Sequence, residues 1–271
     1  TSSLVGSEMC IRDRFYRKHL EKFLFSVPIS LIIKIEWCKF YKAGEEMTPI
    51  SKKNQQRYHS MAHFIQVAIQ IIQEEGLNAL SIRKVAQRAG YNSATLYYYF
   101  SNFEELCIFS CMHLIDEYAK ELQSYLAQAR TPLEKYLKIW ECFCIYSFRN
   151  PDEFWLLFFK HLEDGEKISQ YFKEYYLIFP ENWTDEVREY EEILTSGDLY
   201  EREYLSLVKS LGSMADRLSE EEIYKINEMN ILIYRGMLAF MRENPGRFTP
   251  EEATEKTVEY MRHTLRSYEM L

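Results

Sequence analysis

The chain has 271 residues, 47% of them hydrophobic and 15% aromatic, and a formal net charge of −8. This length suffices for two domains, or for one large helical body with a small head. Nine glycines and seven prolines are few for such a chain and favour helices throughout. No phosphate-cradling glycine loop, nucleophile elbow or convergent set of acid, base and nucleophile occurs, which argues against an enzyme and against a cofactor.

The first 47 residues differ from the rest. Residues 23–33 are apolar but are interrupted by Pro28, and the run is too short to span a membrane. It also lacks the small-residue cleavage site of a signal peptide. Ser2 to Arg14 resembles a translated sequencing adapter, and Met47 would be a sensible start. We therefore expect residues 1–47 to be an artefactual or disordered extension of a cytoplasmic protein that does not associate with membranes.

A first amphipathic helix is predicted over Gln55 to Glu75, ending at Gly76. Its apolar positions recur at helical spacing and would form one buried face. They are Met61, Phe64, Ile65, Ala68, Ile71 and Ile72. Lys52, Lys53 and Arg57 precede or open this helix and could form a short arm that contacts phosphates; solvated surface is the alternative for these three residues.

Residues 81–100 have the pattern of a helix-turn-helix, a motif that places its second helix in the DNA major groove. Ser81 is a suitable N-cap for the first helix, and Gly90 is suited to end it with a positive φ. Asn92 can cap the second helix, whose Leu96 and Phe100 point back into the same small core. A helical hairpin without a DNA role is the alternative.

The charge is unevenly distributed along the chain. Residues 48–103 carry six Lys/Arg and two acidic residues, whereas residues 104–271 carry 19 basic and 33 acidic residues. A basic head on an acidic body is expected for a module that faces duplex DNA. After the head, Ser101 or Asn102 can cap a further helix with Glu104 and Glu105 in its first turn.

The order of these segments resembles a known family. A helix is followed by Glu-Glu-Gly-Leu-Asn-Ala-Leu-Ser, a helix, Ala-Gly-Tyr, a helix and Tyr-Tyr-Tyr-Phe-Ser-Asn-Phe-Glu-Glu-Leu. Over residues 58–106 this closely resembles the tetracycline-repressor (TetR/AcrR) family of bacterial transcriptional regulators. The resemblance implies an all-α homodimer, with a three-helix DNA-binding domain at 48–106 and an effector-binding and dimerisation domain at 107–271.

The resemblance also assigns DNA contacts to positions of this chain. Arg83 matches a position that reads a base or a phosphate, and Ser81 matches a phosphate-contacting cap. The recognition helix would supply base-proximal positions at Ser93, Ala94 and Thr95, and phosphate contacts at Tyr97 and Tyr98.

Three positions depart from the family pattern. Phe103 stands where a lysine is usual, Ser101 replaces a commonly basic residue, and Tyr99 replaces a frequent histidine. Two phosphate-directed charges are therefore missing, and we expect weaker, less salt-dependent DNA binding than is usual. For Tyr99, packing against neighbouring helices is an equal alternative.

The body is predicted to be helical. Thr131, Asn150, Ser219 and Thr249 each stand as a cap just before a proline or an acid. The predicted helices are Pro132–Phe148, Pro151–His161, Ile168–Phe179, a segment within Asp185–Leu194, Leu199–Ser213, Glu220–Glu243 and Pro250–Tyr268.

Aromatic residues in the body suggest an effector pocket. Trp140, Phe143, Phe154 and Phe158 would line an apolar cavity, although their three- to four-residue spacing also fits plain core packing. Apolar stripes on the last two helices could form a four-helix dimer interface with a second copy. The stripes are Ile223, Ile226, Met229, Ile233, Met237 and Phe240, then Val258, Met261 and Leu265.

The cysteines and histidines do not form a recognisable metal site. Cys107 and Cys111, and likewise Cys142 and Cys144, fit buried helix faces in a reducing compartment; a metal or thiol sensor is the alternative. His59 and His63 have the spacing of helical zinc ligands but no third ligand nearby.

The sequence therefore predicts a ligand-responsive repressor that binds a palindromic double-stranded operator as a homodimer and is released by a small apolar or aromatic effector. A helical adaptor whose head has lost DNA affinity is the alternative, and Phe103 is the strongest argument for it.

Overall fold

The structure is a computed structural model, and it describes residues 52–160, 165–184 and 199–268. All described residues belong to one compact unit, Lys52–Leu271. The predicted extension at 1–47 and the predicted segment within Asp185–Leu194 lie outside the described residues, as do the side chains of Lys52 and Lys53.

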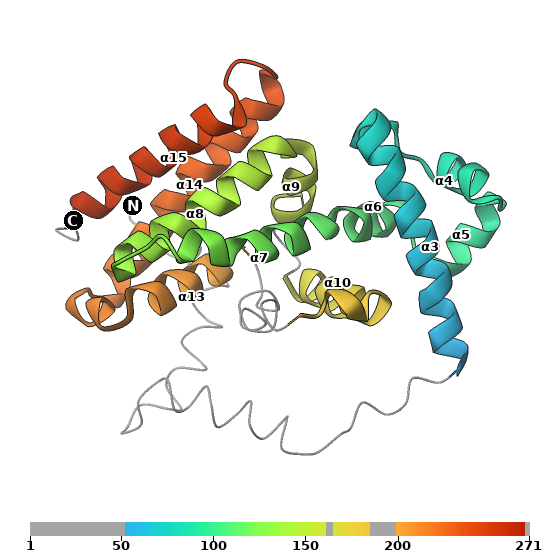
Figure 1. Ribbon diagram of the computed structural model, residues 1–271, viewed down its shortest axis with the longest axis horizontal. Helices are drawn as coiled ribbons and strands as arrows, with labels where there is room; N and C mark the ends of the chain where they lie inside the picture. Colours follow the sequence, from blue (N-terminus) through green and yellow to red (C-terminus); the bar gives the residue numbers. More distant parts are fainter. Residues whose placement is uncertain (1–51, 161–164, 185–198, 269–271) are drawn as a thin grey trace, which may run out of the picture. The chain divides into compact units, whose positions relative to one another are not determined.

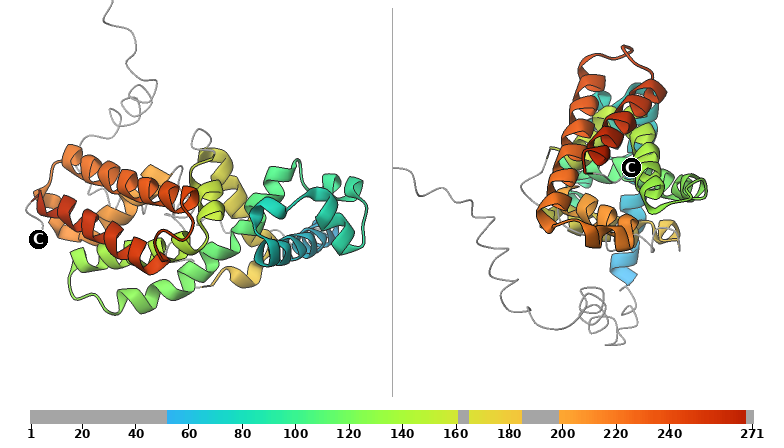
Figure 2. Two further views of the ribbon diagram at one scale, coloured as in Figure 1. Left: turned by 90° about the horizontal axis from the view of Figure 1, so that it is seen from above. Right: turned by 90° about the vertical axis from the view of Figure 1, so that its left-hand side faces the viewer.

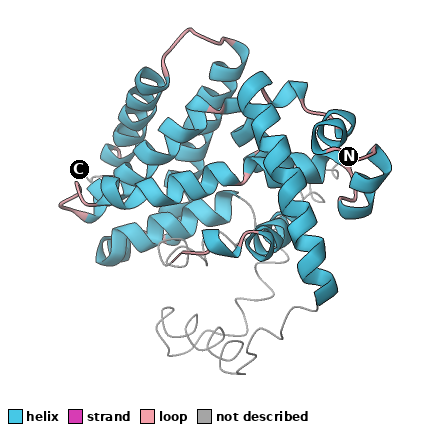
Figure 3. Cartoon of the chain, turned by 45° about the vertical axis from the view of Figure 1, so that its right-hand side comes forward, coloured by secondary structure: helices cyan, strands magenta, loops and turns pink. Residues whose placement is uncertain are grey.

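The described residues are helical or in loops, without a strand (Figure 3), which confirms the predicted all-α class. In chain order the first elements are α3 (Lys52–Glu75), η1 (Leu77–Ala79), α4 (Ile82–Ala89), α5 (Ser93–Tyr99), α6 (Phe103–Cys111) and α7 (His113–Leu126). They continue with α8 (Pro132–Arg149), α9 (Pro151–Phe158), α10 (Gly165–Ile178), η2 (Pro180–Asn182), α13 (Leu199–Leu211), η3 (Gly212–Arg217), α14 (Glu220–Glu243) and α15 (Pro250–Arg266).

Capping residues explain where the long body helices begin. Thr131, Ser219 and Thr249 each accept a hydrogen bond from the backbone N–H three residues on, and the glutamate at that position bonds back to the cap. These capping boxes satisfy N–H groups that otherwise lack an intrahelical partner. Asn150 differs, because its side chain donates to Tyr146 O (3.1 Å) and makes no cap bond to α9.

The helix after the head is interrupted, which the sequence did not indicate. Asn102 caps α6 by accepting from the N–H of Glu105 at 2.8 Å. α6 then ends at Cys111 with Met112 as its C-cap, and α7 begins at His113. Because α6 runs from Phe103 to Cys111, it contains residues on both sides of the predicted boundary at 106–107. The division into a head and a body at that point stays a prediction.

The body helices pack along one another. α8 contacts α7 and α15, and α14 contacts α13 and α15. The views in Figures 1 and 2 show α14 and α15 (orange and red) side by side, with α8 beneath α15. Much of the predicted dimer stripe is used in this packing: Ile223, Ile226, Val258, Met261 and Leu265 are buried within the chain itself.

Candidate nucleic-acid interface and effector cavity

The three helices of the head share a compact core. Phe64 on α3 is 1% exposed, and its ring lies 5.1 Å from that of Tyr91, 5.5 Å from Tyr99 and 6.5 Å from Phe100. Leu96 closes the core from α5 and is fully buried. This packing fixes α5 against α3 and α4, as a helix that reads DNA requires.

The turn between α4 and α5 follows the predicted chemistry. Gly90 ends α4 in the left-handed region, with φ 78°, where residues with a side chain are disfavoured. Ser81 caps α4 by accepting from the N–H of Lys84 (3.2 Å), and Asn92 caps α5 by accepting from the N–H of Thr95 (2.9 Å). The angle between the two helices is thus fixed by local hydrogen bonds and one glycine.

The predicted DNA-facing side of α5 is open in the described part of the chain. Tyr97 is 58% and Tyr98 66% exposed, and Ala94 is exposed near the start of the helix. Ser93 and Thr95 are half-buried, and the Thr95 hydroxyl donates to Asn92 Oδ1 at 3.1 Å. Tyr99 instead packs inward against Phe64, which favours the packing alternative for that residue.

The basic residues of the head are less available than a count suggests. Lys84 pairs with Glu75, and Arg88 Nη1 lies 2.7 Å from Glu74 Oε2. Both pairs are substantially exposed to water, so each contributes little to stability. Arg83, by contrast, is exposed on α4, and within the described residues no ion pair involves it. Arg83, which the family resemblance assigns to a DNA contact, is therefore more available to DNA than Lys84 or Arg88.

Phe103 occupies the first position of α6. Phe103 is 38% exposed and is therefore only partly packed in the core. Its side chain carries no charge, unlike the lysine of the family pattern, which fits the predicted weaker electrostatic attraction of the head to phosphates.

The four predicted pocket residues lie together in the body. Trp140, Phe143, Phe154 and Phe158 are all buried, and the Phe143 ring lies 6.0, 5.5 and 5.3 Å from the other three in that order. Tyr234 on α14 joins them, 5.2 Å from Phe143 and 5.5 Å from Trp140. Tyr234 was not among the predicted pocket residues, although it stands in an apolar register with Ile231 and Leu238.

A cavity of about 50 Å³ borders this cluster. Phe143 and Phe158 line it, whereas Trp140 and Phe154 do not; α7 and α13 supply most of the other walls. The volume exceeds the ~10–15 Å³ that a single water needs, but a drug-sized ligand would have to widen it. Trp140 and Phe154 would then act as packing behind the wall.

One end of this cavity is polar. Arg202, Glu203 and Ser206 line it from α13. Burial raises the pKa of Glu203 to about 7, partly opposed by the charge of Arg202. Glu203 Oε2 has no hydrogen-bond partner among the described residues. These three polar residues are distant in sequence from the predicted aromatic pocket residues. The spacing of apolar residues along the chain therefore could not predict that they line the same cavity.

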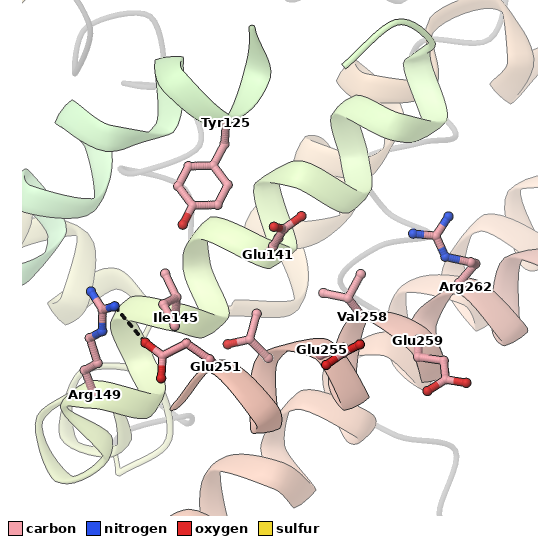
Figure 4. Close-up of a pocket in the computed structure, with 10 residues that line it drawn as sticks. Tyr125, Glu141, Ile145, Arg149, Glu251, Glu255, Val258, Glu259 and Arg262 are labelled. Carbon is pink, nitrogen blue, oxygen red and sulfur yellow. Dashed lines mark hydrogen bonds and ion pairs between the residues drawn. The ribbon is translucent and has the colours of Figure 1, made fainter. Parts of the chain in front are cut away.

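A larger groove of about 520 Å³ lies between α7, α8 and α15 (Figure 4). Its walls are mostly charged, and Arg149 and Glu251 bridge it at 2.9 Å. The lining residues are Tyr125, Glu141, Ile145, Arg149, Glu251, Thr254, Glu255, Val258, Glu259 and Arg262. This groove lacks the apolar walls that small-molecule sites usually have, so the smaller cavity is the better effector candidate.

The described cysteines have the character of core residues. Cys107, Cys111, Cys142 and Cys144 are free and buried. Burial raises the pKa of the Cys107 and Cys142 thiols to about 12, which disfavours the reactive thiolate. Among the described residues no group of three or more His, Cys, Asp or Glu is placed to hold a metal ion. Nor is any described helix both long and apolar enough to cross a bilayer.

Known proteins resemble this chain most clearly at the head. Residues 64–108 match the family described as "Bacterial regulatory proteins, tetR family". The regulator "HTH-type transcriptional regulator BetI" of Brucella canis is 25% identical over 132 residues, which cover 48% of this chain and 62% of the relative. The protein of that name from Brucella suis is 26% identical over 113 residues, which cover 41% and 57%. The chain thus matches less than two thirds of either relative's length.

Solved structures resemble the chain more loosely. FadR of Thermus thermophilus, described as a TetR family transcriptional repressor in complex with lauroyl-CoA, has a TM-score of 0.49 at 13% identity and covers 76% of this chain and 94% of its own. PfmR, a TetR family transcriptional regulator also from Thermus thermophilus, has a TM-score of 0.42 at 20% identity and covers 75% and 97%. The head of the chain, over residues 64–108, is thus similar to the tetR family of bacterial regulatory proteins.

Proposed function

We infer that this protein is a ligand-responsive transcriptional regulator, a repressor that binds a palindromic operator as a homodimer. The observation that carries the proposal is the open side of α5. Tyr97 and Tyr98 on α5 and Arg83 on α4 are exposed to solvent, while Leu96 packs the opposite side of α5 into the core. This is the arrangement that a recognition helix needs.

A second copy would pair through α14 and α15. Leu232 on α14 is 53% exposed, and Tyr260 on α15 is also exposed. Gly236 on α14 has no atom within 4 Å of the position its Cβ would take, so a partner helix has room to approach it. Two heads in such a dimer would read half-sites about 35 Å apart.

The effector would enter at the cavity beside Phe143 and Phe158. Filling it would favour a conformation with widened α7–α13 packing over the narrow one described here. A ligand shifts such an equilibrium only by its difference in affinity for the two states. The effector would then release DNA if, in the widened state, the distance between the two heads of the dimer no longer matched the distance between the operator half-sites.

Two substitutions on the assigned face test the proposal. We expect Arg83→Ala to weaken binding to a duplex from the gene's upstream region by about tenfold or more, the cost of a lost base or phosphate contact. Tyr98→Phe removes only a hydroxyl, so about a fivefold loss is expected. Fluorescence anisotropy measures both, and sedimentation should find the oligomeric state unchanged.

A matched control lies on the body. Arg247→Ala removes an exposed charge from the loop between α14 and α15, away from the head in sequence, and should not alter DNA affinity. If Arg83→Ala and Tyr98→Phe bind the duplex as tightly as wild type, the assigned DNA face is wrong.

The adaptor alternative is favoured by the pairing of Lys84 and Arg88 with Glu75 and Glu74, and by the apolar ring of Phe103. Both features reduce the charge that the head offers to phosphates. An adaptor would not bind duplex DNA at any salt concentration, whereas a repressor binds more tightly as salt is lowered.

A further inference from the structure

The C-terminal end of α5 is held by a side chain from α3. Arg57 Nη2 donates to the carbonyl of Tyr99 at 2.9 Å, and Nη1 reaches the carbonyl of Tyr98 at 3.4 Å. The last carbonyls of a helix lack intrahelical partners, and a cation there also interacts favourably with the helix dipole. Arg57 therefore ties the end of the predicted recognition helix to α3, rather than extending as a free arm.

Arg57 has an acidic neighbour on α10. α10 packs against α3 and α6. Burial raises the pKa of Glu174 on α10, repulsion from Glu105 raises it further, and the positive charge of Arg57 lowers it. The charge of Glu174 is therefore within electrostatic range of Arg57, across the packed helices α10 and α3.

Beyond Glu174, the next two residues of α10 bind a buried acid of the body. Tyr175 and Tyr176 donate their hydroxyls to Asp116 on α7 at 2.6 and 3.1 Å, and Asn182 Nδ2 donates at 2.7 Å. Asp116 is 2% exposed. Removing one partner from a buried network of this kind is costly, because the other groups lose their hydrogen bonds. Asp116 is therefore the anchor of α10 on α7.

The same stretch of α7 forms a wall of the small cavity. Ile115 and Tyr118, which flank Asp116 in sequence, both line it. α7, which lines the cavity, is thus hydrogen-bonded to α10 through Asp116, α10 packs against α3, and Arg57 on α3 holds the end of α5. These three links join α7 to α10, α10 to α3, and α3 to α5.

We propose that Arg57 is a positioning residue for the DNA-reading helix, and that α10, anchored on Asp116, links it to the body. This inference rests on the proposed function and names the regulation of its DNA-binding site. It differs from a phosphate-contacting role for Arg57, because both Nη atoms are directed at backbone carbonyls of α5.

The first experiment measures the mobility of α5 without DNA. Hydrogen exchange is followed in the full chain for peptides covering residues 93–100, with residues 82–89 of α4 as the internal control. Arg57→Lys keeps the charge but loses the two-pronged donor, and we expect it to accelerate exchange in α5 but not in α4. Asp116→Asn should do the same from a distance. Tyr176→Phe, which removes only the 3.1 Å bond, gives a milder variant that keeps the fold.

The second experiment measures affinity for the upstream duplex. Arg57→Lys and Arg57→Ala should each weaken binding by about tenfold or more, the loss expected when a charged group's hydrogen bond disappears. The salt slope should stay as in wild type. Combining either Arg57 substitution with Asp116→Asn should weaken binding by less than the product of the two separate factors. Both substitutions disturb the same link between α10 and the end of α5.

The outcomes separate this inference from the proposed function. If hydrogen exchange in α5 is faster in the variants but the wild-type protein does not bind DNA, the positioning role is supported and the proposed repressor function is overturned. If Arg57→Lys binds as wild type and Arg57→Ala lowers the salt slope by about one, Arg57 contacts phosphate and the inference fails. Unchanged α5 exchange in Asp116→Asn and Tyr176→Phe, or fully additive losses, would show that α10 does not link Arg57 to the body.

Discussion

Phe64→Ala is expected to destabilise the protein by about 3–5 kcal/mol, the usual cost of deleting a buried phenylalanine ring. Phe64 is almost fully buried and contacts rings contributed by the turn after α4 and by the end of α5. Its loss would leave a cavity at the point where the three head helices meet. Urea unfolding followed by circular dichroism measures the change in free energy.

Phe103→Ala is the matched control for this variant. It removes the same ring from a partly exposed site at the start of α6, so we expect a loss below about 1 kcal/mol. Equal losses for the two variants would contradict the assignment of Phe64 as the centre of the head core.

A second large effect is expected in the dependence of stability on pH. Burial raises the pKa of Asp116 from 3.8 to about 6, against the hydrogen bonds from Tyr175 and Tyr176 that lower it. As the pH rises through this interval, the unfolded chain releases the proton before the folded chain does. The folded state is then favoured less, and the stability that Asp116 contributes below pH 3.8 is lost by about pH 6. The total is roughly 3 kcal/mol.

Comparison with Asp116→Asn isolates this contribution. Other buried acids such as Glu203 are present in both proteins, so their titration cancels in the difference. The free energy of unfolding of wild type, minus that of Asp116→Asn, should fall between about pH 4 and about pH 6.5 in urea titrations. A difference that is flat, or that rises with pH, would show that Asp116 is not held as described.

The head could be predicted from sequence because its signals are local. Ser81, Gly90 and Asn92 each act within one helical turn, and all three cap as predicted. Apolar spacing likewise placed Leu96 and Phe100 in the core. The break at Met112 was missed because the apolar run continues through it without a glycine or proline.

The body sites depend on contacts between distant residues. Asp116 meets Tyr175 and Asn182 across roughly sixty positions, and no pattern along the chain marks it. Arg202 and Glu203 reach the cavity beside Phe143 in the same way. The number of Lys and Arg residues predicted a basic head. It did not predict that Lys84 and Arg88 are paired with Glu75 and Glu74.

Phe103→Lys would restore the charge that the family pattern has at this position. We expect it to tighten duplex binding and to steepen the salt dependence by about one phosphate contact per head. A lysine at a helix N-terminus costs about 0.3–1 kcal/mol through the helix dipole, so stability should fall slightly while DNA affinity rises. Phe103→Gln, without a charge, is the control and should leave the salt slope unchanged.

The most direct test of DNA binding by the head is a salt titration of the wild-type protein on a duplex from the gene's upstream region. We predict binding at low salt whose logarithmic affinity falls linearly with the logarithm of salt concentration. An unlabelled duplex of unrelated sequence should compete poorly. An absence of binding at the lowest salt concentration, with the protein folded and at micromolar concentration, would contradict the assignment of α5 as a DNA-reading helix.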